Sequence, residues 1–152
     1  MAVKTYTLNF QQQVSRPLLD VFDFFSRAEN LEELTPPWLN FRIISVKPQP
    51  VQQGTLINYK LRVHGIPLRW TSEIVEWEPP HRFVDLQLRG PYKLWRHEHR
   101  FEPRAGGTLI SDTVTLALPL GFLGQLAYKI KVHSDVQEIF AFREKKIRAL
   151  FG

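Results

Sequence analysis

Residues 90–101 read GPYKLWRHEHRF, and this stretch has the two-residue period of a β-strand. One face of the strand carries three charged side chains of alternating sign, Arg96, Glu98 and Arg100. The other face carries two aromatic rings and two imidazoles, those of Trp95, His97, His99 and Phe101. Burying imidazoles costs free energy unless they are hydrogen-bonded. The pattern is therefore typical of a strand in the wall of a binding cavity rather than in a dry core.

The next strand along the chain supplies a hydrogen-bond partner for these imidazoles. Asp112 stands alone on a face whose other residues are apolar. If the turn between the two strands sets Phe101 opposite Thr108, antiparallel counting sets His97 opposite Asp112. Directly opposed side chains have Cβ atoms about 5 Å apart, so the imidazole and the carboxylate can bond. This pair is either a dyad for proton transfer or a polar pair that orients the cavity wall. The second interpretation is favoured because no nucleophile is evident beside it.

The rest of the chain divides into further strands and two short helices. Residues 6–14 alternate as a first strand, and Ser15-Arg16-Pro17 is typical of a capped helix start. Short helices are predicted around residues 18–25 and 31–34. From residue 38 to residue 117, turns rich in proline and glycine separate a succession of strands, as in an antiparallel meander.

After Pro119 the apolar period changes to about 3.6 residues, which predicts a helix from about Gln125 to Leu150, ~39 Å long. Its apolar stripe consists of Leu123, Leu126, Ile130, Val136, Ile139, Phe140, Ile147 and Leu150. The order of elements predicts an α+β fold in which a curved antiparallel sheet of about seven strands closes on the long helix and encloses a cavity. At 152 residues the chain fits one domain, 1–152.

Composition excludes several classes of function. The chain has no cysteine, so it has no disulfide framework, thiolate metal site or cysteine nucleophile. No apolar run approaches the ~20 residues of a membrane span, and the first residues lack an apolar export segment. We therefore expect a soluble, cytoplasmic protein.

The net charge of +5 permits contact with nucleic acid or anionic lipid. Basic residues gather only near the end, at Lys129, Lys131, Arg143, Lys145, Lys146 and Arg148, a pattern typical of the solvated face of a helix. Together with the apolar loop 118–123, this cluster predicts weak, salt-sensitive contact with anionic membranes. Nucleic-acid binding is not expected, because the informative aromatic residues alternate with charges of both signs and face inward.

The pair His97-x-His99 shares one strand face, so both imidazoles could chelate a metal with Asp112 as a third ligand. Zinc sites normally need three or four well-placed ligands, and the third ligand is uncertain. We therefore expect no bound metal.

The remaining histidines and glycines carry no clear chemical signal. His64 and His81 fall in predicted turns and are expected at the surface, whereas His133 lies near the apolar stripe of the terminal helix and is expected in the core. No phosphate-binding glycine loop and no Gly-x-Ser-x-Gly elbow is present, so no cofactor is predicted.

Several short motifs point to a known superfamily. They are LTPPW at 34–38, FVDLQ at 83–87, GPY at 90–92, WRHEHRF at 95–101, Gly107-Thr108 with Asp112, and LPLG at 118–121. With the order of elements, they resemble the START-related lipid-transfer superfamily, also called SRPBCC, and more narrowly a bacterial branch of it. The resemblance implies the helix-grip fold of pollen allergens and polyketide cyclases. It also implies that Asp85 and Gln87 turn inward, whereas apolar alternation alone would place Val84 and Leu86 inside.

These observations predict a protein that binds a hydrophobic or amphipathic small molecule, such as a lipid, a quinone or a polyketide-like compound, in an internal cavity. The expected ligand-binding residues are Tyr59, Trp70, Asp85, Gln87, Trp95, His97, His99, Phe101 and Asp112. The alternative is a cyclase or hydrolase that uses His97 and Asp112 as an acid/base pair.

Overall fold

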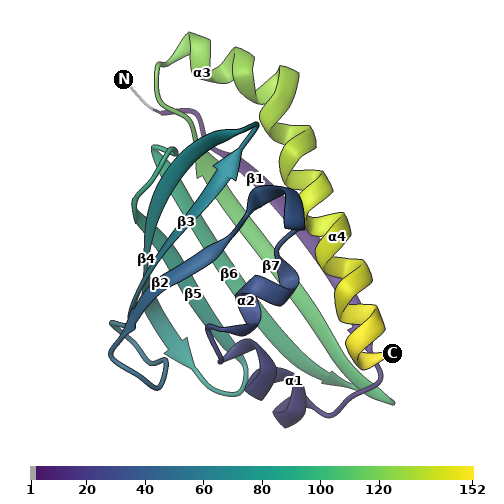
Figure 1. Ribbon diagram of the computed structural model, residues 1–152. Helices are drawn as coiled ribbons and strands as arrows, with labels where there is room; N and C mark the ends of the chain where they lie inside the picture. The colour runs from purple at the N-terminus through teal and green to yellow at the C-terminus, as the bar shows by residue number, and fades with distance from the viewer. Residues whose placement is uncertain (1–2) are drawn as a thin grey trace.

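Seven strands form one antiparallel sheet in the computed structural model, which describes residues 3–152 (Figure 1). The elements are β1 (Tyr6–Val14), α1 (Leu18–Phe25), α2 (Asn30–Leu34), the 3-10 turn η1 (Pro37–Leu39), β2 (Arg42–Lys47), β3 (Leu56–Val63), β4 (Ile66–Glu78), β5 (Arg82–Arg89), β6 (Leu94–Arg104), β7 (Gly107–Ala117), α3 (Phe122–Ala127), the π-helical turn η2 (Tyr128–Val132) and α4 (His133–Phe151). The strand order is β1-β7-β6-β5-β4-β3-β2. The predicted α+β helix-grip fold is confirmed.

The sheet curves around α4, which runs along its open side, while α1 and α2 cover the end nearest the C-terminus (Figure 1). Two apolar clusters hold the layers together. One joins α1 to the middle strands through Phe22, Phe83 and Phe101. The other joins β1 and β7 to α4 through Leu8, Val114 and Phe140. The sheet therefore contacts the helix near both of its ends, and a space remains between the sheet and the helix.

The start of α1 differs from the prediction. The helix begins at Leu18, with Pro17 as its N-cap residue and no side-chain cap bond, so the predicted capping role of Ser15 is wrong. Ser15 lies beside the C-terminus instead, where its N–H donates to the carbonyl oxygen of Gly152 at 3.4 Å.

The predicted register of β6 and β7 is wrong by two residues. Arg104 pairs with Gly107 across a tight turn, which sets His99 rather than His97 opposite Asp112. Gly106 makes this turn possible because its φ of +79° suits a residue without a Cβ atom. A shift of two residues keeps every side chain on its predicted face, since the side-chain period of a strand is two.

Strand β5 turns Asp85 inward, as the resemblance implies and against apolar alternation. Val84 is fully buried on the opposite face, where its register neighbours are Glu76 and Glu98. Arg82 bonds both of these glutamates, so a layer of long charged side chains lies over Val84. Charged side chains thus bury Val84 on the outer face of the sheet. The alternation of apolar and polar residues cannot distinguish this kind of burial from burial in the core.

The C-terminal helical run is continuous from α3 through η2 to α4, and its first part extends past the sheet (Figure 1). Val136, Phe140 and Ile147 are buried as predicted. The predicted burial of Leu123, Leu126 and Ile130 is wrong, because all three are exposed where the helical run extends past the sheet (Figure 1). Within residues 3–152, no helix is long and apolar enough to cross a membrane.

Candidate functional site

A cavity of about 700 Å³ lies between the concave face of the sheet and α4. Six of the residues predicted to bind a ligand line it: Tyr59, Trp70, Asp85, Trp95, His97 and His99. Apolar side chains of α2, β3, β4 and α4 supply most of the remaining wall. The alternation of residues 95–99 therefore correctly predicts the strand face that forms one side of this cavity.

The other three predicted residues lie outside the lining. Gln87 secures the turn between β5 and β6, because its amide donates to the carbonyl oxygen of Tyr92 at 2.7 Å and accepts from the Tyr92 N–H at 3.1 Å. Phe101 is fully buried in the core beside Phe22 and Phe25, at ring-centroid distances of 5.5 and 5.2 Å. Asp112 lies behind the imidazoles.

The aromatic part of the wall consists of rings that contact one another. Trp70 stacks with Tyr59 at 5.7 Å and meets Trp95 edge-on at 5.5 Å between ring centroids. The Trp70 indole N–H donates to Ser72 Oγ at 3.0 Å, so its one polar atom is satisfied. Burial raises the pKa of Tyr59 well above its ordinary value, so its hydroxyl stays protonated. This wall presents largely apolar surface to the cavity.

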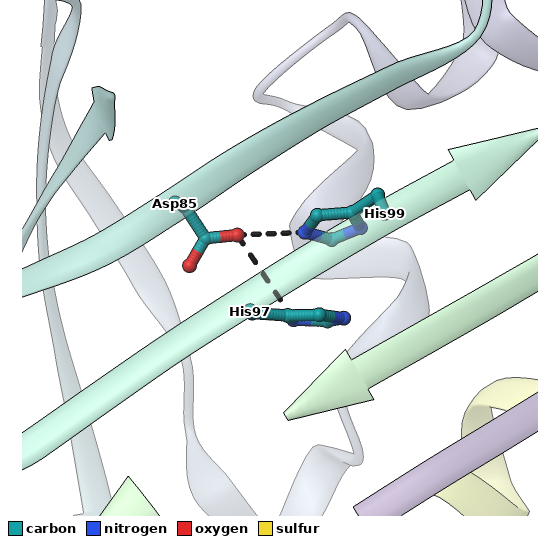
Figure 2. A group of neighbouring side chains, drawn as sticks. All are labelled: Asp85, His97 and His99. Atoms are coloured by element: carbon teal, nitrogen blue, oxygen red, sulfur yellow. Dashed lines mark hydrogen bonds and ion pairs between the residues drawn. The ribbon is translucent and has the colours of Figure 1, made fainter. Parts of the chain in front are cut away.

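The polar end of the cavity is built from two stacked imidazoles between two carboxylates, those of Asp85 and Asp112. Figure 2 shows Asp85 with both imidazoles. The rings of His97 and His99 lie 3.7 Å apart at an angle of 24°. His99 Nε2 lies 2.6 Å from Asp85 Oδ2, and His97 Nε2 lies 2.8 Å from Asp112 Oδ1. The predicted bond between His97 and Asp112 is therefore present, reached diagonally across the strands rather than directly.

Arg143 of α4 completes this group, and the sequence analysis missed it. Its Nη2 donates to Asp112 Oδ1 at 3.2 Å, and its side chain is buried rather than part of the solvated basic cluster. Helical spacing could have identified Arg143 as a buried residue, since position 143 is three residues after Phe140 and four before Ile147. An arginine on the buried face of a helix needs a buried anion as its partner, and the inward-facing Asp112 is such an anion.

Burial and neighbouring charges shift the pKa values of the two carboxyl groups in opposite directions. Burial alone would raise the pKa of Asp112, but Arg143 and the imidazoles outweigh it and hold this pKa far below its ordinary value. Burial likewise raises the pKa of Asp85, yet hydrogen bonding from His99 leaves it lowered overall. Burial lowers the pKa of His99 to about 4, helped by the neighbouring His97 ring. At neutral pH both carboxylates are therefore ionised and His99 is neutral.

The mouth of the cavity is bordered by the β3–β4 hairpin and the start of α4. His64 lies at the tip of the hairpin and bonds Asp135 Oδ2 through Nε2 at 2.9 Å. The predicted surface positions of His64 and His81 are confirmed, since both are exposed. The prediction that His133 is a core residue is wrong, because α4 turns its side chain outward.

Comparison with known proteins agrees with this architecture. A family model described as "Polyketide cyclase / dehydrase and lipid transport" matches residues 14–137. No curated protein matches the chain in sequence.

Three solved structures illustrate the likeness of fold. A protein of Chromobacterium violaceum has a TM-score of 0.74 at 15% identity, covering 96% of this chain and 97% of that chain. Major latex-like protein 151 of Panax ginseng has a TM-score of 0.71 at 11% identity, covering 97% of each chain. A point mutant of Thalictrum norcoclaurine synthase, in complex with a transition-state analogue, has a TM-score of 0.69 at 12% identity, covering 95% of each chain. At these identities the likeness concerns the fold alone.

Proposed function

Because the chain belongs to the polyketide cyclase / dehydrase and lipid transport family, we propose that it binds and carries a hydrophobic or amphipathic small molecule of the lipid, quinone or polyketide type. The cavity between the sheet and α4 is the observation that supports this function. Its volume of about 700 Å³ falls within the ~300–1,000 Å³ of typical small-molecule sites. Its wall is largely apolar, and Asp85, His97, His99 and Arg143 converge at one end.

This polarity predicts how such a ligand lies. Its apolar part packs against the aromatic wall around Trp70 and gains ~2.5 kcal/mol for each ~100 Å² of apolar surface removed from water. Its oxygen-bearing group lies at the polar end, beside His97 and Arg143. The Nε atom of Arg143 is buried and has no hydrogen-bond partner within residues 3–152, so it is a donor available to that oxygen.

The carrier function is tested by filling the cavity. Ile139 lines the cavity from α4, so Ile139→Trp should exclude ligand. The control is Leu88→Trp, which adds a similar volume at an exposed position outside the cavity. We expect an anilinonaphthalene fluorophore to bind at least about tenfold more weakly to Ile139→Trp, a loss of ~1.4 kcal/mol, and normally to Leu88→Trp. Equal binding to both variants would place the ligand elsewhere.

Mass spectrometry of lipophilic material that remains bound through native purification identifies the cargo. Wild type and Leu88→Trp should carry the same compound, and Ile139→Trp should carry little of it. A compound retained equally by all three proteins would not be held in the cavity.

An exposed apolar surface beside the mouth supports loading from a membrane. It consists of Leu120, Phe122, Leu123, Leu126 and Ile130 of the α3–η2 region, each at least 44% exposed. Lys129 and Lys131 flank this surface, and Leu118 and Val132 connect it to the cavity lining. Apolar contact combined with lysine charge suits an anionic lipid surface.

Vesicle co-sedimentation tests this contact. Wild type should sediment with anionic vesicles at low salt and much less with neutral vesicles or at high salt. Leu123→Ser should weaken the association, whereas Leu19→Ser, at an equally exposed leucine of α1, should not. Equal sedimentation with neutral and anionic vesicles would contradict the proposed contact.

The bond between His97 and Asp112 favours a second candidate function, the cyclase or hydrolase activity. With its ring proton on Nε2 and directed to Asp112, His97 presents the Nδ1 lone pair as a base. An enzyme of this kind should lose ~100-fold to ~10,000-fold of its turnover in His97→Ala and also be impaired in Asp112→Asn. A carrier should instead return the identified ligand chemically unchanged from wild type and from both variants.

A further inference from the structure

Three possible metal-ligating atoms meet at the polar end of the cavity, one from each of Asp85, His97 and His99. They lie within 4.8 Å of one another and come from the adjacent strands β5 and β6 (Figure 2). We propose that these three residues bind a divalent first-row transition-metal cation. This reverses the expectation from the sequence, which considered Asp112 rather than Asp85 as the third ligand. The site does not depend on which molecule fills the cavity.

The separations are close to those of a metal site. Ligand atoms about 2.1 Å from a metal lie roughly 3.0–3.4 Å from each other in octahedral or tetrahedral geometry. Asp85 Oδ2 is 2.6 Å from His99 Nε2 and 3.9 Å from His97 Nδ1, values that bracket this range.

Asp112 fixes the orientation of the His97 imidazole and faces that of His99. A metal-binding histidine normally donates its other ring N–H to a carboxylate, which fixes the tautomer. Asp112 Oδ1 lies 2.8 Å from His97 Nε2 and 3.5 Å from His99 Nδ1, on the side away from Asp85. Arg143 in turn holds Asp112. The lone pair of His99 Nε2 then faces Asp85 at 2.6 Å, and His97 Nδ1 lies 3.9 Å from the same carboxylate oxygen.

Hydrogen bonding at His99 supplies a second, independent observation. A neutral imidazole has one ring proton, and placing it on Nε2 to reach Asp85 leaves Nδ1 without a donor or an acceptor partner. Among residues 3–152, the buried Nδ1 of His99 indeed has no hydrogen-bond partner. A cation at Nε2 moves the proton to Nδ1, where it faces Asp112. Cation binding thus gives Nε2 a ligand bond and turns the Nδ1 proton toward Asp112 Oδ1, which lies 3.5 Å away.

The donor set indicates the class of metal. Two imidazoles and one carboxylate suit zinc or ferrous iron, whereas magnesium and calcium prefer oxygen ligands alone. The three side chains line the cavity, so the remaining coordination positions face it. An oxygen atom of a cavity ligand, or water, can occupy them.

Cobalt(II) titration of the full chain, stripped of metal by a chelator, tests the site. Tetrahedral or five-coordinate cobalt absorbs visible light, and we expect saturation at one equivalent with displacement by zinc. Paramagnetic cobalt should broaden the amide resonances of Asp85, His97 and His99 before any others. The absence of saturable binding, or broadening centred elsewhere, would overturn the proposal. Because the broadening is measured on wild type, it decides the question even if a variant fails to fold.

Variants separate this site from surface histidines. Asp85→Asn removes the charged ligand and should weaken cobalt binding by more than the ~10–100-fold expected for the positioning residue in Asp112→Asn. His64→Ala and His81→Ala remove exposed imidazoles and should leave binding unchanged. Unchanged binding in Asp85→Asn, or its loss in His64→Ala, would show that cobalt binds outside the proposed site. Ligand binding in the cavity is measured separately with the fluorophore, so failure of one proposal does not imply failure of the other.

Discussion

Arg143 lies among apolar rings because Asp112 compensates its charge. Its guanidinium carbon lies 5.1 Å from the Phe25 ring centroid and 5.6 Å from that of Phe140, while Nη2 bonds Asp112. The pair joins α4 to β7 at the polar end of the cavity. Removing one partner of a buried ion pair is more costly than removing both, because the remaining charge stays in a low-dielectric environment.

The first prediction follows from this asymmetry. Arg143→Met keeps most of the side-chain volume and leaves the buried Asp112 carboxylate without its guanidinium partner, so it should lower the free energy of unfolding by ~3–5 kcal/mol. The control is Arg148→Met on the exposed side of α4, where the bond to Glu144 is solvent-screened and the effect should stay within ~0.5 kcal/mol. Urea denaturation measures both. Equal, small losses would show that Arg143 is not essential to the buried pair.

The second prediction concerns pH and His99. Its pKa is about 4 in the folded protein, mainly because of burial, against ~6.5 in the unfolded chain. Between these values the unfolded chain binds the additional proton, so the free energy of unfolding should fall as pH decreases from ~6.5 to ~4, by roughly 3 kcal/mol. Asp85 and Asp112, whose folded pKa values are lowered, should add a further loss below about pH 4.

Urea denaturation of chelator-treated protein across this pH range measures the effect. His99→Gln keeps a donor for Asp85 but does not titrate, so it should lose the slope between about pH 6.5 and 4. His81→Ala, at an exposed position, should retain it. A slope that persists in His99→Gln would assign the titration to another group.

At the scale of elements, sequence patterns predicted which face of a strand is buried better than they predicted its partners. The faces of β6 and β7 were correct because their polar and apolar residues alternate strictly. Their register was not, because it depends on whether the turn uses two residues or more, and Pro103 through Gly107 permits several lengths.

The C-terminal helical run and β5 show which structural features the periodicity of apolar residues does not predict. The apolar stripe beginning at Leu123 has helical spacing, but spacing does not reveal where the sheet beneath it ends. Asp85 became recognisable as an inward residue only through the resemblance, since Val84 beside it is buried under ion pairs on the outer face. The candidate site could therefore be identified only by combining the chemistry of its residues with their three-dimensional arrangement.

The third prediction belongs to the hairpin that sets the register of β6 and β7. A Cβ atom at Gly107 would overlap the carbonyl oxygen of Val14 in the neighbouring strand β1, whereas one at Gly106 would meet only open space. Gly106→Ala should cost ~1 kcal/mol, because its positive φ disfavours a side chain. Gly107→Ala should cost at least about twice as much, since backbone atoms must shift. Thermal unfolding ranks the two variants, and the reverse order would contradict the close approach of β1.

At the scale of the whole molecule, the protein's interior consists of two apolar clusters, and the cavity lies between them. Residues of both clusters line the cavity, including Phe83 from one and Phe140 from the other. A ligand that fills the cavity makes van der Waals contacts with residues of both clusters and binds only the folded chain, so ligand binding and folding stability are coupled.

The last prediction uses that coupling. A ligand at about 100 times its dissociation constant stabilises the folded state by ~2.7 kcal/mol, which should raise the melting temperature of a domain of this size by roughly 5–10 °C. In Ile139→Trp the indole occupies part of the cavity, so the same ligand should raise the melting temperature much less. Leu88→Trp should respond like wild type, since its added ring lies outside the cavity. Differential scanning calorimetry of the three proteins with the co-purified compound measures these shifts. A full shift in Ile139→Trp would mean that the compound stabilises the fold from another surface and that the cavity is not its binding site.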